Sequence, residues 1–218
     1  MRSMGFLRRP LLILSILVHC KCQSGDDSET GDTSVKAIYV KKLLNGTDPL
    51  IVFLGNEGEI NHPICWQSMK TDNIERGFRH NLTYFRKDKQ CRKKHGSWQV
   101  RNTTYRVSRR KQVPTTGVTA LMANGATDED ISRVYDIFYA QPFCFVMGTP
   151  QNESAGFTMG SNGLRISPDD SRCLLWGPVN IQRETRIVCE EEFFNLCNNV
   201  GIYPYRYRKR VCDTEEEE

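Results

Sequence analysis

Apolar and polar residues alternate in short runs over most of the chain, which is the pattern of β-strands with one buried face. Turn residues such as His95-Gly96 and Asn124-Gly125 separate these runs. The strands predicted in this way cover residues 49–54, 63–69, 77–86, 97–109, 117–123, 133–139, 143–147, 156–166 and 173–176. Many short strands with regular turns favour an all-β fold, either a sandwich or an up-and-down barrel.

Two segments have apolar residues at helical spacing instead. Residues 35–44 predict a helix that ends at Asn45-Gly46. Residues 186–197 predict a second helix, because three side chains recur at every fourth position and share one face: Cys189, Phe193 and Cys197. We expect this helix to lie against the outside of a sheet, with its cysteines as anchors.

The first 22 residues have the pattern of a cleaved secretory signal peptide. Three arginines precede an apolar run of only 8 residues, 11–18, whereas a membrane-spanning helix needs about 20. The sequence therefore predicts a signal peptide over 1–22, an acidic flexible leader over 23–34, a single domain over 35–212 and an acidic tail over 213–218. We expect the mature chain to be secreted and not bound to a membrane.

Removal of residues 1–22 changes the charge and the cysteine count. It takes away four of the 30 basic residues and no acidic ones, which leaves 26 of each, so the charge gives no case for binding nucleic acid. Two of the nine cysteines leave as well, and the remaining seven are an odd number for a secreted chain. Four glycosylation sequons agree with secretion, at Asn45, Asn81, Asn102 and Asn152.

No motif predicts catalysis or a bound metal. The histidines of the mature chain, His62, His80 and His95, have no metal-ligand spacing. The chain has neither a Gly-x-Ser-x-Gly sequence nor a Gly-rich phosphate loop. We therefore expect a protein that is not an enzyme and needs no cofactor.

Most of the mature chain resembles the tick salivary lipocalins, a family that includes the histamine-binding proteins. The resemblance rests on Val134–Tyr139, Cys144-Phe-Val, Cys173-Leu-Leu-Trp176, the helix with two cysteines and the closing Cys212, together with Cys65-Trp66 nearer the amino terminus. It implies an eight-stranded antiparallel lipocalin barrel, stapled by disulfides, with an amino-terminal helix and a carboxy-terminal helix packed outside. It also implies a non-enzymatic scavenger of host mediators in tick saliva, which we expect to be a monomer.

The same resemblance implies a disulfide pairing: Cys144 with Cys173, Cys65 with Cys189, and Cys197 with Cys212. The sequence alone leaves the pairing open, since six cysteines permit 15 arrangements. Cys91 would remain unpaired, either as a buried or capped thiol or as an intermolecular bridge.

Alternation along barrel strands predicts which residues face the interior. If Asn81 and Asn102 carry glycans and face outward, their neighbours face inward: Leu82, Tyr84 and Arg86 on one strand, and Arg101, Thr103, Tyr105 and Val107 on the next. The resemblance places Phe145 and Leu174 inside, at positions where amine-binding members carry acids. Trp176, Phe143 and Tyr139 would face the same way, with plain core packing as the alternative role.

Apolar residues at those two positions argue against histamine, because a buried ammonium without a counter-charge costs several kcal/mol. The sequence instead predicts a lipid ligand such as a leukotriene or thromboxane, with Arg101 or Arg86 gripping a carboxylate. Two alternatives stay open. One is a biogenic amine, histamine or serotonin. The other is a host defence protein bound to the outer surface, through the basic stretches 86–94, 106–111 and 206–210.

Overall fold

The computed structural model describes residues 28–87, 96–110, 112–150, 158–159, 165–166 and 171–213. Several sequence predictions lie outside these residues. They are the signal peptide, Cys91, Asn152, His95, most of the strand expected over 156–166 and nearly all of the acidic tail.

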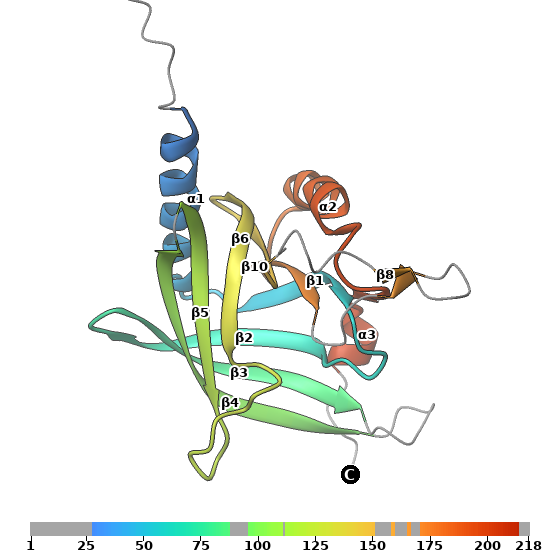
Figure 1. Ribbon diagram of the computed structural model, residues 1–218. Coiled ribbons are helices and arrows are strands. Elements are labelled where there is room, and N and C mark those ends of the chain that lie inside the picture. The colour runs from blue at the N-terminus through green and yellow to red at the C-terminus, as the bar shows by residue number, and fades with distance from the viewer. Residues whose placement is uncertain are drawn as a thin grey trace, which may run out of the picture.

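Eight strands form a closed antiparallel barrel (Figure 1). They are β1 (Leu50–Glu57), β2 (Ile64–Ile74), β3 (Gly77–Lys87), β4 (Gly96–Arg110), β5 (Val113–Leu121), β6 (Arg133–Gln141), β7 (Cys144–Gly148) and β10 (Arg172–Pro178). Each strand pairs with the next, and β10 pairs back with β1, so that the sheet closes on itself. An eight-stranded barrel with this up-and-down order has the architecture of the lipocalins, and the predicted fold class is confirmed.

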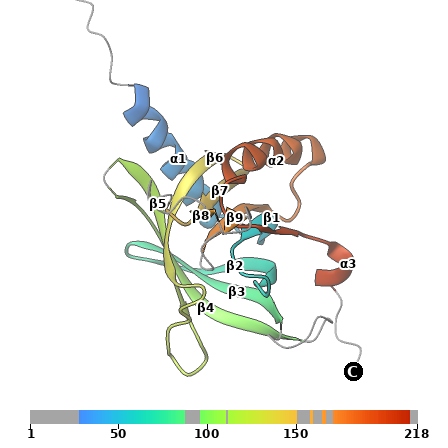
Figure 2. The same cartoon turned by 45° about the vertical axis from the view of Figure 1, so that its right-hand side comes forward.

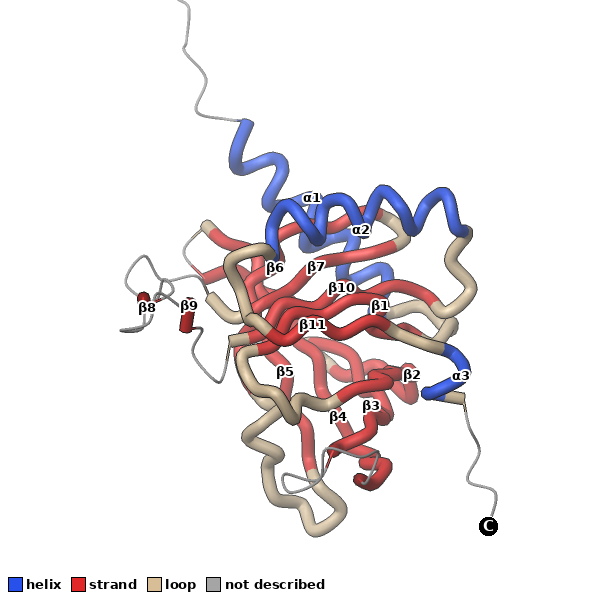
Figure 3. The backbone as a smooth tube through the Cα atoms, turned by 90° about the vertical axis from the view of Figure 1, so that its right-hand side faces the viewer, coloured by secondary structure: helices blue, strands red, loops and turns tan. Residues whose placement is uncertain are grey.

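The remaining elements lie outside the barrel wall. α1 (Ser28–Leu44) precedes the barrel, and α2 (Arg183–Cys197) follows it. β11 (Tyr203–Arg206) adds to the edge of β1, and the short helix α3 (Lys209–Cys212) follows. β8 (Thr158–Met159) and β9 (Arg165–Ile166) pair only with each other. Figure 3 shows α2 lying along the outside of the wall, next to the strands β7, β10 and β1.

Alternate residues of the strands fill the interior, as predicted. Leu82 and Tyr84 on β3, and Arg101, Thr103 and Tyr105 on β4, are buried. Asn81 and Asn102 stand opposite each other on the outer face and are exposed, as glycan attachment requires. Asn45 is also exposed.

α1 begins at Ser28, inside the segment expected to be a flexible leader. Apolar periodicity marks only the packed part of a helix, and here that part is the end nearest the barrel. Val40, Leu43 and Leu44 belong to the same buried cluster as the barrel interior. α1 therefore covers one end of the barrel, and the loop between β5 and β6 lies at the other end (Figure 1).

A chain of buried hydrogen bonds fixes the end of α1. The carbonyl of Leu44 can only accept, so Nε2 of His80 donates to it at 2.9 Å. Nδ1 of His80 must then accept from the Ser68 hydroxyl at 3.0 Å, and Tyr105 donates to Ser68 at 3.1 Å. This chain requires a neutral His80, because a doubly protonated ring has no acceptor nitrogen.

Two disulfides attach α2 to the barrel wall, Cys144–Cys189 and Cys173–Cys197. The predicted pairs Cys144–Cys173 and Cys65–Cys189 are therefore wrong. Cys144 and Cys173 do lie on adjacent strands, but Phe145 stands opposite Trp176, which puts the two cysteines four residues out of register. That offset is about 13 Å along a strand, too far for a direct bond.

This offset of about 13 Å matches the distance between the two cysteines of α2. Cys189 and Cys197 are eight residues apart on α2, and eight residues of helix rise about 12 Å. Each strand cysteine thus meets one helix cysteine. The third disulfide joins Cys65 to Cys212, so the predicted pair Cys197–Cys212 is also wrong, and β2 is tied directly to α3.

We expect the stability of the protein to fall as the pH falls from about 6.5 to about 4. Burial is the main cause that lowers the pKa of both His62 and His80 to about 4. Histidines in the unfolded chain keep a pKa of about 6.5, so in this window only the unfolded state takes up their protons. Each histidine therefore removes about 1.4 kcal/mol of stability per pH unit as the pH falls.

Urea unfolding of the wild type and of His80→Gln at several pH values between 4 and 7 checks this prediction. Glutamine can still donate to the Leu44 carbonyl but does not titrate. We expect the stability of the variant to fall less steeply with falling pH than that of the wild type. The difference in slope should correspond to about one proton, which is about 1.4 kcal/mol per pH unit. Equal slopes in the two proteins would show that His80 is not held neutral.

Candidate functional site

Aromatic side chains from four strands meet inside the barrel. The rings of Trp66 and Tyr84 lie 5.2 Å apart between centroids, and those of Trp66 and Trp176 lie 6.3 Å apart, edge to face. Phe145 stacks parallel to Trp176 with centroids 6.4 Å apart. All four side chains are fully or almost fully buried. The interior therefore has an apolar, aromatic centre.

An ion pair borders this centre at the point where the barrel closes. Glu57 and Arg172 are opposite each other in the pairing of β1 with β10, and they are only 2% and 7% exposed. Nε of Arg172 donates to Oε2 of Glu57 at 2.6 Å, and Nη1 donates to the Tyr135 hydroxyl at 3.2 Å. The guanidinium lies 5.2 Å from the centre of the Trp66 ring, a cation–π distance.

A second ion pair lies on the opposite wall. Nε of Arg101 donates to Oδ2 of Asp128 at 2.6 Å, and the hydroxyl of Tyr84 donates to the same oxygen at 2.7 Å. Asp128 belongs to the β5–β6 loop, residues 122–132. Arg172 reaches this loop too, through the carbonyl of Asp130 at 3.0 Å. We call this end of the barrel, formed by the two ion pairs and residues 122–132, the mouth.

The pKa values at the mouth reflect burial and pairing. Burial raises the pKa of Glu57 against the opposing effect of Arg172. Burial would also raise the pKa of Asp128, but the hydrogen bonds from Arg101 and Tyr84 outweigh it and the pKa is lowered. Burial and the bond to Asp128 raise the pKa of Tyr84, so this phenol remains a hydrogen-bond donor at neutral pH.

Two buried polar atoms in this region have no hydrogen-bond partner among the described residues. They are Oε1 of Glu57, which can accept, and Nε1 of Trp176, which can donate. Most buried polar atoms in proteins are satisfied, so such atoms usually meet a water or a ligand. Both belong to residues of the aromatic centre and its border.

The structure places most of the predicted site residues in the interior. Tyr84, Arg101, Tyr105, Phe145, Leu174 and Trp176 are buried there. Arg101 faces inward as expected, but its guanidinium already donates to Asp128, to the Val100 carbonyl and to Gln99. It is therefore poorly suited to grip a ligand carboxylate. Arg86, the other candidate, binds Asp130 near the surface.

Tyr139 and Phe143 lie on the other side of the wall, where they pack against the cluster under α2. A bulge between Ile137 and Tyr139 breaks the alternation of β6 against β7, so Ile137 and Ala140 face inward instead. Phe143 lies in the turn that joins β6 to β7, so alternation along a strand does not apply to it. Counting back from Phe145 therefore gave the wrong face for both residues.

Of the four charged residues in the two ion pairs of the mouth, sequence reasoning found Arg101 and missed Arg172, Glu57 and Asp128. Alternation could have found Arg172, because this residue lies two positions before Leu174 and four before Trp176. On one strand, residues at these spacings face the same side. Glu57 was hidden by a bulge in β1 between Val52 and Leu54. Asp128 lies in a loop, where no periodic signal exists.

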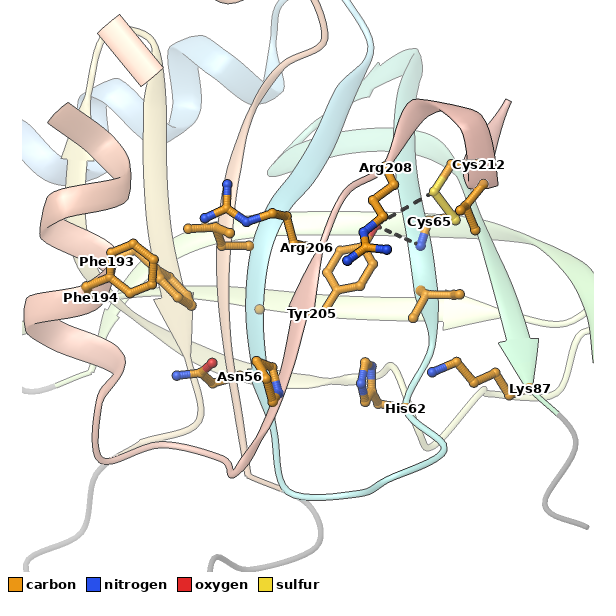
Figure 4. Close-up of a pocket in the computed structure, with 15 residues that line it drawn as sticks. Asn56, His62, Cys65, Lys87, Phe193, Phe194, Tyr205, Arg206, Arg208 and Cys212 are labelled. Carbon is orange, nitrogen blue, oxygen red and sulfur yellow. Dashed lines mark hydrogen bonds between the residues drawn. A yellow bond between two sulfur atoms is a disulfide. The ribbon is translucent and has the colours of Figure 1, made fainter. Parts of the chain in front are cut away.

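A separate pocket of about 510 Å³ lies beside the barrel, where β11 approaches the start of β2 (Figure 4). We call it the seam pocket. It shares only Tyr205 and Ile64 with the interior cluster and its neighbours. Its other lining residues are Leu54, Gly55, Asn56, His62, Cys65, Lys87, Phe193, Phe194, Pro204, Arg206, Arg208, Val211 and Cys212.

Two further classes of site were searched for in the described part of the chain. No group of three or more histidine, cysteine, aspartate or glutamate residues there could hold a metal ion. No helix in these same residues is both long and apolar enough to cross a membrane.

Comparison with protein-family models gave no match, and comparison with curated proteins gave none either. Among solved structures, the chain is similar to Japanin from Rhipicephalus appendiculatus bound to cholesterol, in an orthorhombic crystal form. The identity is 13%, the match covers 77% of this chain and 97% of that chain, and the TM-score is 0.47. The barrel fold of this chain is defined by its own strand pairing.

We expect the substitution Arg172→Met to destabilise the protein by about 3–5 kcal/mol, because it leaves the buried Glu57 carboxylate without its partner. The double substitution Glu57→Leu with Arg172→Met should recover most of this loss, since no buried charge remains. Urea unfolding with the disulfides intact measures both effects.

Arg79→Met is the matched control, because Arg79 pairs with Asp72 at 4.0 Å on the exposed surface. Such a pair contributes about 0–1 kcal/mol. A double variant as unstable as Arg172→Met alone would show that the loss is caused by packing and not by the unpaired charge.

Proposed function

We propose that the protein is a secreted salivary lipocalin that binds a small host mediator inside its barrel and thereby suppresses host inflammation and defence. The ligand is a lipid of the leukotriene or thromboxane class, and it enters through the mouth. Eight-stranded barrels of this kind are just wide enough to hold one small ligand. Three disulfides support the assignment to an oxidising, extracellular compartment.

The observation that carries this proposal is the pair of unsatisfied polar atoms at the aromatic centre and at its border with the mouth. Nε1 of Trp176 offers a donor and Oε1 of Glu57 an acceptor, both without a partner among the described residues. A ligand with an apolar body and hydroxyl groups would contact the rings of Trp66, Trp176 and Phe145 and satisfy both atoms. Apolar pockets with a few well-placed polar groups are typical of ligand sites.

Both buried carboxylates of the mouth are paired with arginines. This pairing favours such a ligand over one that binds mainly through a charged group. Glu57 is paired with Arg172, and Asp128 is paired with Arg101. An ammonium ligand would therefore meet a carboxylate that already has a cation at 2.6 Å. A carboxylate ligand would not find Arg101 free, so the head group of a lipid is better placed toward solvent at the mouth.

A biogenic amine remains the second candidate, because Glu57 has one oxygen without a described partner beside an aromatic centre. Aromatic rings and a carboxylate together are the usual receptors for an organic cation. The guanidinium of Arg172 opposes this reading.

Titration calorimetry with a hydroxylated leukotriene and with histamine tests the proposal. We expect heat with the leukotriene and no heat with histamine. Trp176→Phe should weaken leukotriene binding about 3- to 10-fold, because it removes one hydrogen-bond donor and keeps a ring in place.

Trp98→Phe is the matched control, since Trp98 packs against Phe85 and is not part of the interior cluster. Its affinity should stay within about twofold of the wild type. Heat with histamine alone would favour the amine, and equal effects of the two substitutions would contradict binding at the aromatic centre.

A further inference from the structure

The seam pocket exists because the barrel wall divides beside β1. β2 pairs with β1 only at Leu50 and Ile51, and from Leu54 to Glu57 the same edge of β1 carries β11 instead. β2 turns away at Cys65, which has a φ of 57°, a value uncommon for a residue other than glycine. A bulge between Ile64 and Gln67 marks the same departure.

Covalent and hydrogen-bonded contacts hold the seam in this shape. The Cys65–Cys212 disulfide ties β2 to α3 across it. The backbone N–H of Cys65 donates to the Tyr205 hydroxyl at 2.9 Å, which links β2 to β11 (Figure 4). Figure 2 shows that α3 continues directly from β11 and lies apart from α1. The seam pocket is therefore a preformed feature of the wall.

The lining of the seam pocket carries only one sign of charge. Lys87, Arg206 and Arg208 border it, and none of its fifteen lining residues, all described, is acidic. Arg206 already pairs with Glu190 of α2, at 3.5 Å. Lys87 and Arg208 are therefore the main cations of the seam pocket that remain to bind a ligand. Burial lowers the pKa of Lys87, against the opposing effect of Glu57.

His62 adds no further cation. Burial, aided by Lys87 and Arg172, lowers the pKa of His62 to about 4, so its imidazole is neutral at physiological pH. Its Nδ1 donates to the Pro63 carbonyl at 3.1 Å, because a carbonyl can only accept.

The opposite end of the seam pocket is apolar. Phe193 and Phe194 of α2 and Leu54 of β1 form it, and the side chain of Phe194 is 54% exposed. Figure 4 shows the two phenylalanines on one side of the seam and Lys87 and Arg208 on the other. The volume of about 510 Å³ lies within the range of small-molecule sites, about 300–1,000 Å³.

We infer that the seam pocket is a second ligand site, which binds a single-chain fatty acid with its carboxylate at Lys87 and Arg208 and its acyl chain toward Phe193 and Phe194. The guanidinium fork of Arg208 and the ammonium of Lys87 donate to the carboxylate oxygens. The acyl chain covers the exposed ring of Phe194, and burial of this apolar surface is favourable. This site lies beside the barrel and does not depend on the proposed interior site.

Binding of a dansylated undecanoic acid, followed by fluorescence, tests this inference. The probe should bind the wild-type protein, and the double variant Lys87→Gln with Arg208→Gln should raise its Kd about tenfold or more. The corresponding dansylated alcohol should bind about tenfold more weakly than the acid. Phe194→Ser should weaken the binding of both probes, since it removes an exposed ring from the apolar end.

Arg109→Gln with Arg110→Gln is the matched control, because it removes two exposed cations from the far end of β4. Its Kd should stay within about twofold of the wild type. Trp176→Phe should likewise leave the acid bound, which separates this site from the interior one. Equal binding of acid and alcohol, equal losses in both double variants, or loss only in Trp176→Phe would overturn the inference.

Discussion

The pairing of β1 with β10 is the constraint on which the rest of the structure depends, because it alone turns the sheet into a barrel. At the mouth this pairing ends in Glu57 opposite Arg172, a buried ion pair. The same guanidinium also holds Tyr135 and the β5–β6 loop and lies over Trp66. One arginine thus connects the closure of the barrel, the position of the mouth loop and the aromatic centre. A buried charge pair costs desolvation energy, and that cost is consistent with a role in positioning rather than in stability alone.

The carboxy-terminal segment supports this barrel from outside. Two disulfides fasten α2 over β7 and β10, and the third fastens α3 to β2. Between these anchors β11 takes the edge of β1 that β2 leaves. The disulfides therefore supply part of the stability that the interior would otherwise have to provide. The same anchors also create the seam pocket on the outer wall. An interior site and an outer site follow from one covalent framework.

Alternation within regular strands was sufficient for the all-β class and for the inward-facing residues of β3 and β4. The choice of a barrel over a sandwich, and the inward positions of Phe145 and Leu174, came from the family resemblance. Sequence reasoning failed where alternation is interrupted. Bulges in β1 and β6 concealed Glu57 and reversed Tyr139, and the loop that carries Asp128 has no period. The disulfide pairing depended on the register of β7 against β10, which no local pattern encodes. The seam pocket depends on where β11 docks, a contact between residues about 150 positions apart.

The most direct test of the account is a nitrogen-15 spectrum of the tryptophan indole groups during addition of the interior ligand. The three tryptophans are in different surroundings: Trp66 donates to the Pro63 carbonyl, Trp98 packs beside Phe85, and Trp176 has no described partner. We expect the Trp176 signal to shift most as its N–H gains an acceptor, and the Trp98 signal to stay unchanged. A saturating ligand that moves only Trp98, or none of the three, would contradict binding at the aromatic centre.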